Sequence, residues 1–231
     1  EHILESVQAH FDANALFKGK NFLVTAGPTH EAIDPVRFIG NHSSGKMGVA
    51  IAEELAKKGA NVVLVLGPSA LNAIHPNIKT IRIKSAAEMY EIARSYHQEM
   101  DGCIFAAAVA DYSPLHPSHE KIKKTGEELQ ILLKKNVDIA GTLGKTKKAG
   151  QIHVGFALET QDEEINAKAK LEKKNFDMIV LNSLNDPGAG FKHTTNKVSL
   201  FFKNGEKIRS QLLPKNKIAV LIVENIKKLF S

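Results

Sequence analysis

The chain has 231 residues, a formal net charge of +6 and 43% hydrophobic residues, which are ordinary values for a globular protein with a full core. No apolar run approaches the length of about 20 residues that a membrane-spanning helix needs. The single cysteine excludes an internal disulfide, and both observations together predict a cytoplasmic protein without a membrane partner. Because the chain starts at Glu1, with no signal peptide and no initiator Met, we expect a fragment of a longer protein.

The N-terminal half alternates between strand and helix patterns. Residues 1–18 have an amphipathic helical pattern, so we interpret them as a linker helix ahead of one domain that covers 19–231. Continuous apolar runs predict buried strands, and apolar residues at helical spacing predict helices. The expected strands are Phe22–Ala26, Asn61–Leu66, Ile78–Ile83 and Cys103–Ala108, and the expected helices are Met47–Lys58 and Ala86–His97. This succession predicts an α/β, Rossmann-like three-layer fold with a mostly parallel sheet.

The C-terminal half begins with a polar segment at 113–127, which contains two prolines and is interpreted as a mobile loop. A glycine-bearing loop is expected over 182–196. Asn204-Gly205 between two apolar runs predicts a C-terminal β-hairpin, which we expect to be appended to the sheet. The further expected strands are Leu129–Leu133, Ile152–Phe156, Asp177–Leu181, Val198–Phe202 and Lys207–Leu212, and the helices are Asp138–Lys147, Asp162–Lys174 and Lys215–Phe230.

The segment Asn41–Gly48 combines two serines, a lysine and two glycines at a predicted helix start. It does not match the G-x-x-x-x-G-K-[ST] phosphate loop, because Met47 follows Lys46, and the G-x-G-x-x-G dinucleotide fingerprint is also absent. Backbone N–H groups and the hydroxyls of Ser43 and Ser44 could bind an anion there. Serine capping beside a close-packed glycine explains the same residues equally well, so both interpretations stay open.

Small residues end the strand at Cys103–Ala108 and lead on to Asp111. Alanines at a strand end let a flat ligand lie against the backbone, and the carboxylate could then accept hydrogen bonds from a ribose. A tightly packed strand with Asp111 as a turn cap is the alternative. Cys103 itself is interpreted as a small buried strand residue rather than a nucleophile.

Two groups of lysines are candidates for binding a polyphosphate. Lys121, Lys123 and Lys124 lie in the polar segment, which could close over a ligand as a lid. Lys170 and Lys174 lie four residues apart on one helix face, and neither has an acidic residue four positions before it. An anion between them would relieve their mutual repulsion. A solvated charged face remains the ordinary alternative for both groups.

Six segments resemble, in order along the chain, motifs of bacterial phosphopantothenoylcysteine synthetase, usually the C-terminal half of a bifunctional coenzyme A biosynthesis protein. Each motif alone is modest, whereas six in this order are specific, and the resemblance covers about residues 20–230. The segments are Thr25–Thr29, Asp34–Arg37, Asn41–Gly48, Ala107–Tyr112, Lys121–Lys124 and Gly155–Thr160. The flavin-dependent decarboxylase half of such proteins is not in this sequence, so no flavin is expected in this part.

The resemblance implies a ligase that joins 4′-phosphopantothenate to L-cysteine with CTP as cosubstrate. The substrate carboxylate attacks the α-phosphate of CTP, an acyl-cytidylate forms and pyrophosphate leaves, while Mg²⁺ shields the phosphates. The cysteine amine then attacks the activated carbonyl and releases CMP. The family also implies a homodimer, for which Asn41–Gly48 and the C-terminal hairpin are the expected contacts, with the former completing a neighbouring site.

The resemblance also implies roles for individual residues. Lys121 would be catalytic, because it would stabilise charge on the leaving pyrophosphate, and Asn41 would bind the acyl-cytidylate and assist its conversion. Asp111 would hold the ribose and Phe156 would pack on the base. The other nucleotide-binding candidates are Ala106, Ala107, Val137, Asp138, Ile139, Ala140, Lys170 and Lys174, and the other substrate-binding candidates are Arg37, Ser43, Ser44, Lys46 and Ala108. Val137 replaces the family's usual proline, which leaves the shape of its loop open.

Two other classes of function compete with the ligase. A Rossmann-type NAD(P)-dependent oxidoreductase fits the strand and helix pattern but lacks the glycine fingerprint. A basic nucleic-acid-binding module fits the positive charge, yet the lysines are spread out and the chain has no Trp. The histidines show no metal-ligand spacing, so no protein ligand to a metal is assigned, and no G-x-S-x-G hydrolase motif occurs.

Overall fold

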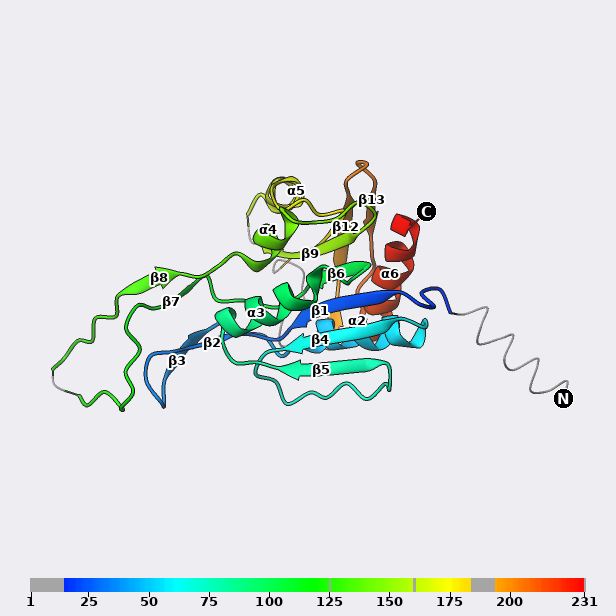
Figure 1. Cartoon of the computed structure of the whole chain (residues 1–231). Helices are drawn as coiled ribbons and strands as arrows, with labels where there is room; N and C mark the ends of the chain where they lie inside the picture. Colours follow the sequence, from blue (N-terminus) through cyan, green and yellow to red (C-terminus); the bar gives the residue numbers. More distant parts are fainter. Residues whose placement is uncertain (1–14, 125, 160, 184–193, 231) are drawn as a thin grey trace, which may run out of the picture.

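The computed structural model describes residues 15–124, 126–159, 161–183 and 194–230. Within these residues, the centre is an eight-stranded sheet with the strand order β13-β12-β10-β9-β6-β1-β4-β5 (Figure 1). Six adjacent strands are parallel, namely β5 (Ile78–Arg82), β4 (Asn61–Leu66), β1 (Asn21–Ala26), β6 (Gly102–Phe105), β9 (Ile152–Glu159) and β10 (Met178–Ser183). β12 (Val198–Phe202) and β13 (Lys207–Arg209) extend the sheet in antiparallel direction.

Helices cover both faces of the sheet, which makes three layers (Figure 1). α2 (Lys46–Lys57) and α6 (Lys215–Lys227) lie on one face, and a short 3₁₀ turn follows α6. α3 (Ala86–His97), α4 (Ile139–Gly144) and α5 (Glu163–Lys173) lie on the other face. The mostly parallel sheet between two helical layers confirms the predicted fold class.

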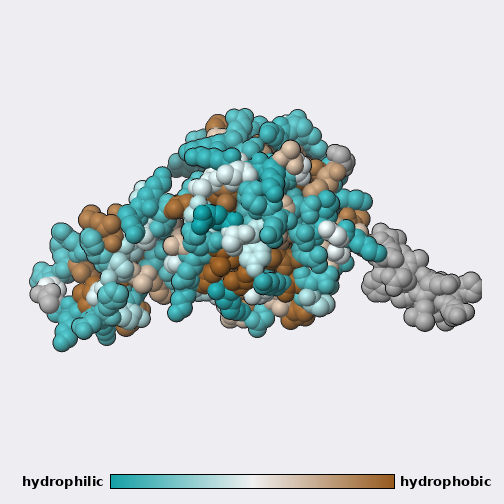
Figure 2. Space-filling model, in the orientation of Figure 1, coloured by the Kyte–Doolittle hydropathy of each residue, from teal (hydrophilic) through white to brown (hydrophobic). Residues whose placement is uncertain are grey.

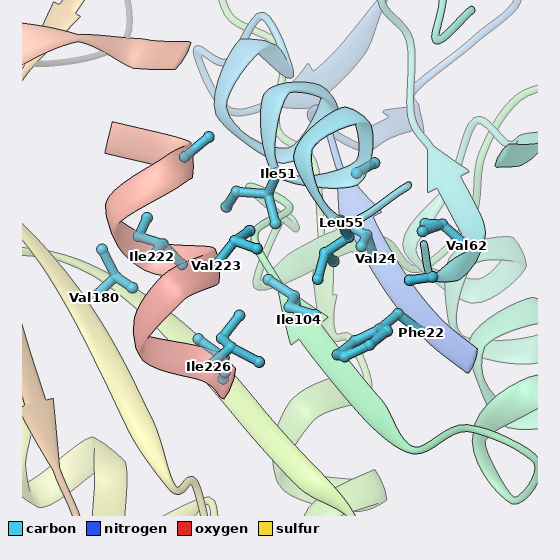
Figure 3. Packing of buried hydrophobic residues seen from close by; sticks show 14 of the residues in the cluster. Phe22, Val24, Ile51, Leu55, Val62, Ile104, Val180, Ile222, Val223 and Ile226 are labelled. Atoms are coloured by element: carbon cyan, nitrogen blue, oxygen red, sulfur yellow. The ribbon is translucent and has the colours of Figure 1, made fainter. Parts of the chain in front are cut away.

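The strand pattern explains how both faces are buried. Along β1, Phe22 and Val24 enter the core beneath α2 and α6, while Leu23 enters the opposite core beneath α3, α4 and α5. In the first core, Ile51 of α2 and Val223 of α6 point toward one another above the strands (Figure 3). α2 and α6 are therefore direct neighbours, although they lie at opposite ends of the chain.

The C-terminal hairpin extends the sheet at one edge, which confirms the predicted extension. β12 pairs with β10 in a register that places Leu200 opposite Val180, and both side chains are fully buried. The turn at Asn204-Gly205 has the predicted position, and Gly205 has a φ of 89°. Two short strands, β11 (Thr195–Asn196) and β14 (Leu213–Pro214), form a separate pair beside it.

Two further hairpins project together from one end of the sheet (Figure 1). One consists of β2 (His30–Ala32) and β3 (Phe38–Gly40), and the other of β7 (Tyr112–Pro114) and β8 (Leu133–Lys135). We call the described residues of these two hairpins, 30–40, 112–124 and 126–135, the arm. The first hairpin was not predicted from the sequence.

The arm corrects two predictions. The strand expected at Leu129–Leu133 is wrong, because the strand formed is β8, and Leu129 and Leu132 are exposed rather than buried. The segment interpreted as a mobile loop starts with β7 and is tied to the first hairpin, since the backbone N–H of Ser118 donates to the carbonyl of Ile33 at 2.9 Å.

The expected N-terminal helix at 1–18 lies almost entirely outside the described residues. In the described part of the chain, no helix combines the length and apolar character needed to cross a membrane.

Candidate active site at the carboxyl end of the sheet

The chain segments that leave β1 and β6 run side by side beyond the ends of these strands. The N–H of Ala106 donates to the carbonyl of Thr25 at 3.1 Å, and that of Ala108 donates to Gly27 at 2.9 Å. β6 itself ends at Phe105, so the strand predicted to continue to Ala108 is shorter. The alanines form a loop at the carboxyl end of the sheet, which is where ligands bind in open α/β folds.

A cavity of about 530 Å³ lies on one side of this alanine loop. We call it the larger cavity, and its volume is typical of a small-molecule site. Its lining residues are Asn41, His42, Ser43, Ser44, Gly45, Lys46, Met47, Gly48, Ala106, Ala107, Ala108, Phe156, Ala157, Leu158, Asn182, Asn196 and Lys215. The predicted residues Asn41, Ser43, Ser44, Lys46 and Ala108 are therefore brought together.

Two glycines let the serine-containing segment, residues 41–48, pack against the sheet. Gly45 has a φ of 77°, and a Cβ on Gly48 would lie 2.4 Å from the Cβ of Ala26. α2 then starts at Lys46 without a side-chain cap. Within the capping interpretation, the close-packed glycine is confirmed and the serine cap of the helix is wrong, and the anion site stays a prediction. The first turn of α2, which has no acidic residue, faces the cavity.

Asn41 joins the serine-containing segment to the alanine loop. Its Nδ2 donates to the carbonyl of Val109 at 2.9 Å and approaches that of Ala108 at 3.4 Å. These bonds leave the side-chain oxygen of Asn41 as the group able to accept a hydrogen bond from a ligand. Asn41 therefore lies beside the wall that separates two cavities.

A second cavity, of about 400 Å³, lies on the other side of the alanine loop. We call it the smaller cavity. Its lining residues are Thr25, Phe105, Ala107, Ala108, Val109, Ala110, Asp111, Lys135, Asn136, Val137, Asp138, Ile139, Ala140, Phe156, Lys170, Lys173, Lys174 and Phe176. The cavities share a wall of Ala107, Ala108 and Phe156. Of the predicted nucleotide-binding residues, Ala106 lines only the larger cavity and Lys121 lines neither.

The two helix lysines of the smaller cavity have carboxylate partners, so the interpretation that they lack one is wrong. Lys170 lies 3.1 Å from Glu159, and Lys174 lies 2.8 Å from Asp138. Both acids come from other elements, which is why spacing along the helix did not reveal them. Burial acts to raise the pKa of Asp138, but hydrogen bonds from Lys174 and the N–H of Gly141 lower it.

Arg37 and Lys121 lie in the arm, away from the lining of both cavities. Arg37 donates to the carboxylate of Asp34 and to the carbonyl of Ile122 at 3.0 Å, so it connects the two hairpins. The Arg37 guanidinium and nearby backbone N–H groups hold the pKa of buried Asp34 well below its usual range. Lys121 precedes Ile122 and is exposed. Their predicted roles in substrate binding and catalysis stay predictions.

Several lining residues were missed from the sequence. Lys215 starts α6 and lines the larger cavity, where Asn196 donates to Asn182 at 2.9 Å. Lys135 and Lys173 line the smaller cavity. Lys173 could have been found, because it directly precedes Lys174, whereas Lys215 comes to the site only through the packing of α6 against α2.

A buried cluster lies behind the smaller cavity. The ligand atoms of His97, Cys103 and His153 lie within 4.8 Å of one another. Burial raises the pKa of the Cys103 thiol, which makes it a poor metal ligand and agrees with its predicted role as a buried strand residue. Burial and the charges of His97 and Lys147 lower the pKa of His153 to about 3. The nearby positive charge also disfavours a bound cation, so we assign no metal to this cluster.

The two histidines are arranged as a hydrogen-bonded pair. Gln98 Nε2 donates to Thr146 at 3.1 Å and lies 3.1 Å from His97 Nδ1, so this amide donates to both. His97 then carries its proton on Nε2 and donates to His153 Nε2 at 3.0 Å. Since the ring of His153 contacts Phe105, which lines the smaller cavity, this pair supports the cavity floor.

Comparison with known proteins gives the family. A family model described as DNA/pantothenate metabolism flavoprotein C-terminal domain matches residues 17–230. Over 98% of its length the chain is 47% identical to a cysteine/cysteine sulfinic acid decarboxylase from an unknown prokaryotic organism, of which it covers 64%. Over 98% of its length it is also 43% identical to the coenzyme A biosynthesis bifunctional protein CoaBC of Bacillus subtilis (strain 168), of which it covers 56%.

A solved structure agrees with this assignment. The crystal structure of the C-terminal domain of a coenzyme A biosynthesis bifunctional protein CoaBC has 42% identity and a TM-score of 0.79, and the match covers 94% of this chain and 97% of that one. The chain spans 56–64% of the length of the two curated relatives. The resemblance predicted from the motifs is confirmed: the chain belongs to the DNA/pantothenate metabolism flavoprotein C-terminal domain family, which includes the C-terminal domain of CoaBC.

Proposed function

We propose that the chain is a phosphopantothenate–cysteine ligase that works with CTP through an acyl-cytidylate. The observation that carries the proposal is the wall of Ala107, Ala108 and Phe156 between the two cavities. The smaller cavity, rich in lysine, suits a nucleoside triphosphate, and the larger cavity suits the acid. Two ligands that meet at a thin wall of alanines can bring a carboxylate to an α-phosphate.

The reaction needs two transfers at this wall. A carboxylate oxygen of 4′-phosphopantothenate bonds to the α-phosphorus of CTP, and the bond from that phosphorus to the bridging oxygen breaks, so pyrophosphate leaves. The amine of L-cysteine then bonds to the acyl carbon, the acyl–oxygen bond breaks, CMP leaves and one proton is released. Mg²⁺ arrives on the nucleotide phosphates as part of the substrate.

Two residues act in separate steps of this scheme. Asn41, beside the wall, holds the acyl-cytidylate for attack by the amine. Lys121 neutralises charge on the leaving pyrophosphate, which requires the exposed arm to bring its ammonium group to the smaller cavity. Such a contact can come from movement of the arm or from a second copy of the chain.

The surface of the arm supports the proposed homodimer. Most of the exposed large apolar side chains of the described residues lie there, namely Val36, Phe38, Tyr112, Leu115, Leu129, Leu132 and Leu133. Figure 2 shows separate hydrophobic patches among hydrophilic side chains on this projecting part of the molecule. Apolar patches of this kind mark association surfaces. The arm is thus a better candidate for the contact than the C-terminal hairpin, and light scattering that finds a monomer at micromolar concentration would exclude the dimer.

The relatives are longer than this chain, so the function of the whole protein belongs to the proposal. CoaBC is described as bifunctional, and the cysteine/cysteine sulfinic acid decarboxylase is named for decarboxylation. We propose that the full-length protein joins the ligase to a flavin-dependent decarboxylase domain. The family does not favour the NAD(P)-dependent oxidoreductase.

Half-reaction assays test the function. With CTP, Mg²⁺ and 4′-phosphopantothenate, we expect pyrophosphate and a bound acyl-cytidylate but little free CMP. Addition of L-cysteine should release CMP together with 4′-phosphopantothenoylcysteine. The variant Lys121→Gln should block the first step. Pyrophosphate release that requires no acid, or faster turnover with ATP or GTP than with CTP, would refute the proposal.

A further inference from the structure

The backbone beside Lys121 is fixed by side chains of the other hairpin of the arm. Ile122 directly follows Lys121, and both of its backbone groups are bonded. Its N–H donates to the carboxylate of Asp34 at 3.2 Å, and its carbonyl accepts from the guanidinium of Arg37 at 3.0 Å. An exposed lysine therefore extends from a backbone position that is held at two points.

Asp34 is the centre of this contact. Its side chain is fully buried, and one carboxylate oxygen accepts from the N–H groups of Val36 and Arg37, each at 2.8 Å. The other oxygen accepts from the Nε of Arg37 at 2.9 Å and from the N–H of Ile122. Hydrogen bonds to a charged group are stronger than neutral ones. One buried carboxylate thus fixes its own turn and the segment that carries Lys121.

The contact has no direct place in the two cavities. Neither Asp34 nor Arg37 is among the described residues that line them. A lysine on an unrestrained loop loses conformational freedom when it binds a phosphate, whereas a fixed backbone has already lost most of it. The contact also makes the two hairpins one unit. Lys121 is therefore presented in the same way whether the arm moves or a second copy of the chain supplies it.

We infer that Asp34 is a positioning residue for Lys121, because its carboxylate fixes the backbone from which the ammonium group reaches the leaving pyrophosphate. This inference rests on the proposed function, which gives Lys121 its role. Asp34 itself contacts no ligand. The sequence-based expectation, by contrast, assigned only Arg37 of this segment, and assigned it to substrate binding.

The test measures the two half-reactions separately in Asp34→Asn. The asparagine keeps an acceptor for the turn but places an N–H donor against Arg37 or the N–H of Ile122. At saturating ligands, we expect pyrophosphate release to slow by about 10- to 100-fold, the effect of losing a charged hydrogen bond. The Kd values of CTP and 4′-phosphopantothenate should stay unchanged, because Lys121 acts on charge that develops in the transition state.

The second half-reaction supplies the comparison. After a long incubation that lets the acyl-cytidylate form, L-cysteine should release CMP from Asp34→Asn as fast as from wild type. Glu128→Gln, which removes an exposed carboxylate of the same arm, is the matched control. Unchanged pyrophosphate release in Asp34→Asn, or equal slowing of both half-reactions, would overturn the inference.

A readout without substrates tests the positioning itself. Trypsin cleaves after lysine, and we expect cleavage at Lys121 to be faster in Asp34→Asn than in wild type. Asp34→Ser keeps an acceptor for the turn but is too short to reach Ile122, so it should give the same result and replaces the asparagine variant if that variant does not fold. Unchanged cleavage in the folded variants would also overturn the inference. Faster cleavage, with no pyrophosphate released by wild type from CTP and the acid, would refute the proposed function but keep the positioning of Lys121.

Discussion

The two cavities share a wall, yet they hold positive charge in different ways. In the smaller cavity, Lys170 and Lys174 each contact a carboxylate, on Glu159 and Asp138. In the larger cavity, no described lining residue is acidic, and burial together with the charge of Lys46 lowers the pKa of Lys215. An anion that binds to the lysines of the smaller cavity must displace these carboxylates. The smaller cavity therefore favours a highly charged triphosphate, and a single phosphate suffices for the larger one.

A substitution beside the shared wall should have the largest effect on the rate of the reaction. Asn41→Asp would place a carboxylate against the carbonyl oxygens of Ala108 and Val109, which now accept from Asn41. We expect the cysteine-dependent step to slow by about 10²- to 10³-fold, and cytidylate formation to slow less. Quenched-flow measurement of pyrophosphate and CMP separates the two steps. Equal loss in both steps would contradict the role given to Asn41.

A substitution behind the smaller cavity should affect the binding of CTP and not the binding of the acid. A Cβ on Gly155 would lie 2.0 Å from the ring of Phe176, which lines that cavity. Gly155→Ala should lower the free energy of unfolding by about 1–3 kcal/mol through overpacking and should raise the KM for CTP. Urea unfolding and steady-state kinetics measure both effects. Gly126→Ala is the control, since nothing lies within 4 Å of its added Cβ.

Substitutions of Lys174 and of its carboxylate partner Asp138 test the difference between the two cavities further. Lys174→Ala should weaken CTP binding by about tenfold, the effect of losing one charged hydrogen bond. Asp138→Asn keeps an acceptor for the N–H of Gly141 but removes the competing charge, so CTP should bind more tightly. Isothermal titration measures both, with Lys168→Ala as the control outside the cavity. Weaker binding in Asp138→Asn would show that the carboxylate does not compete with the nucleotide.

Low pH should destabilise the fold around the smaller cavity. Near neutral pH, this is the smallest of the expected effects. The pKa of His153 falls from its ordinary 6.5 to about 3 in the folded chain. Between these values the unfolded chain binds more protons, so stability is complete above pH 6.5 and is lost as the pH falls. The slope reaches about 1.4 kcal/mol per pH unit for one histidine. His153→Gln should flatten this slope in urea titrations between about pH 4 and 7, and an unchanged slope would exclude His153 as its source.

The parallel sheet could be predicted because its strands are buried on both faces and therefore read as continuous apolar runs. Asn61–Leu66 shows this case, and its predicted bounds agree with β4. The arm could not be predicted in the same way. Phe38 and Leu132 are apolar but exposed, so their pattern does not report contact with the core of the same chain.

The same distinction separates the residues of the candidate site that could be predicted from those that could not. Residues of the Asn41–Gly48 segment and of the alanine loop were predicted as candidates because each group lies at the end of a strand or the start of a helix. Lys215 was missed, since it reaches the cavity through the packing of α6 against α2. Glu159 was missed as a partner of Lys170 because their contact joins a strand to a helix.

A crossed titration tests the division of the two ligands most directly. The affinities of CTP and of 4′-phosphopantothenate are measured by isothermal titration for wild type, Lys174→Ala and Lys215→Gln. If the smaller cavity holds the nucleotide and the larger one holds the acid, Lys174→Ala weakens only CTP and Lys215→Gln weakens only 4′-phosphopantothenate. Comparable weakening of both ligands by each variant, or the reverse pattern, would contradict the assignment of the two cavities.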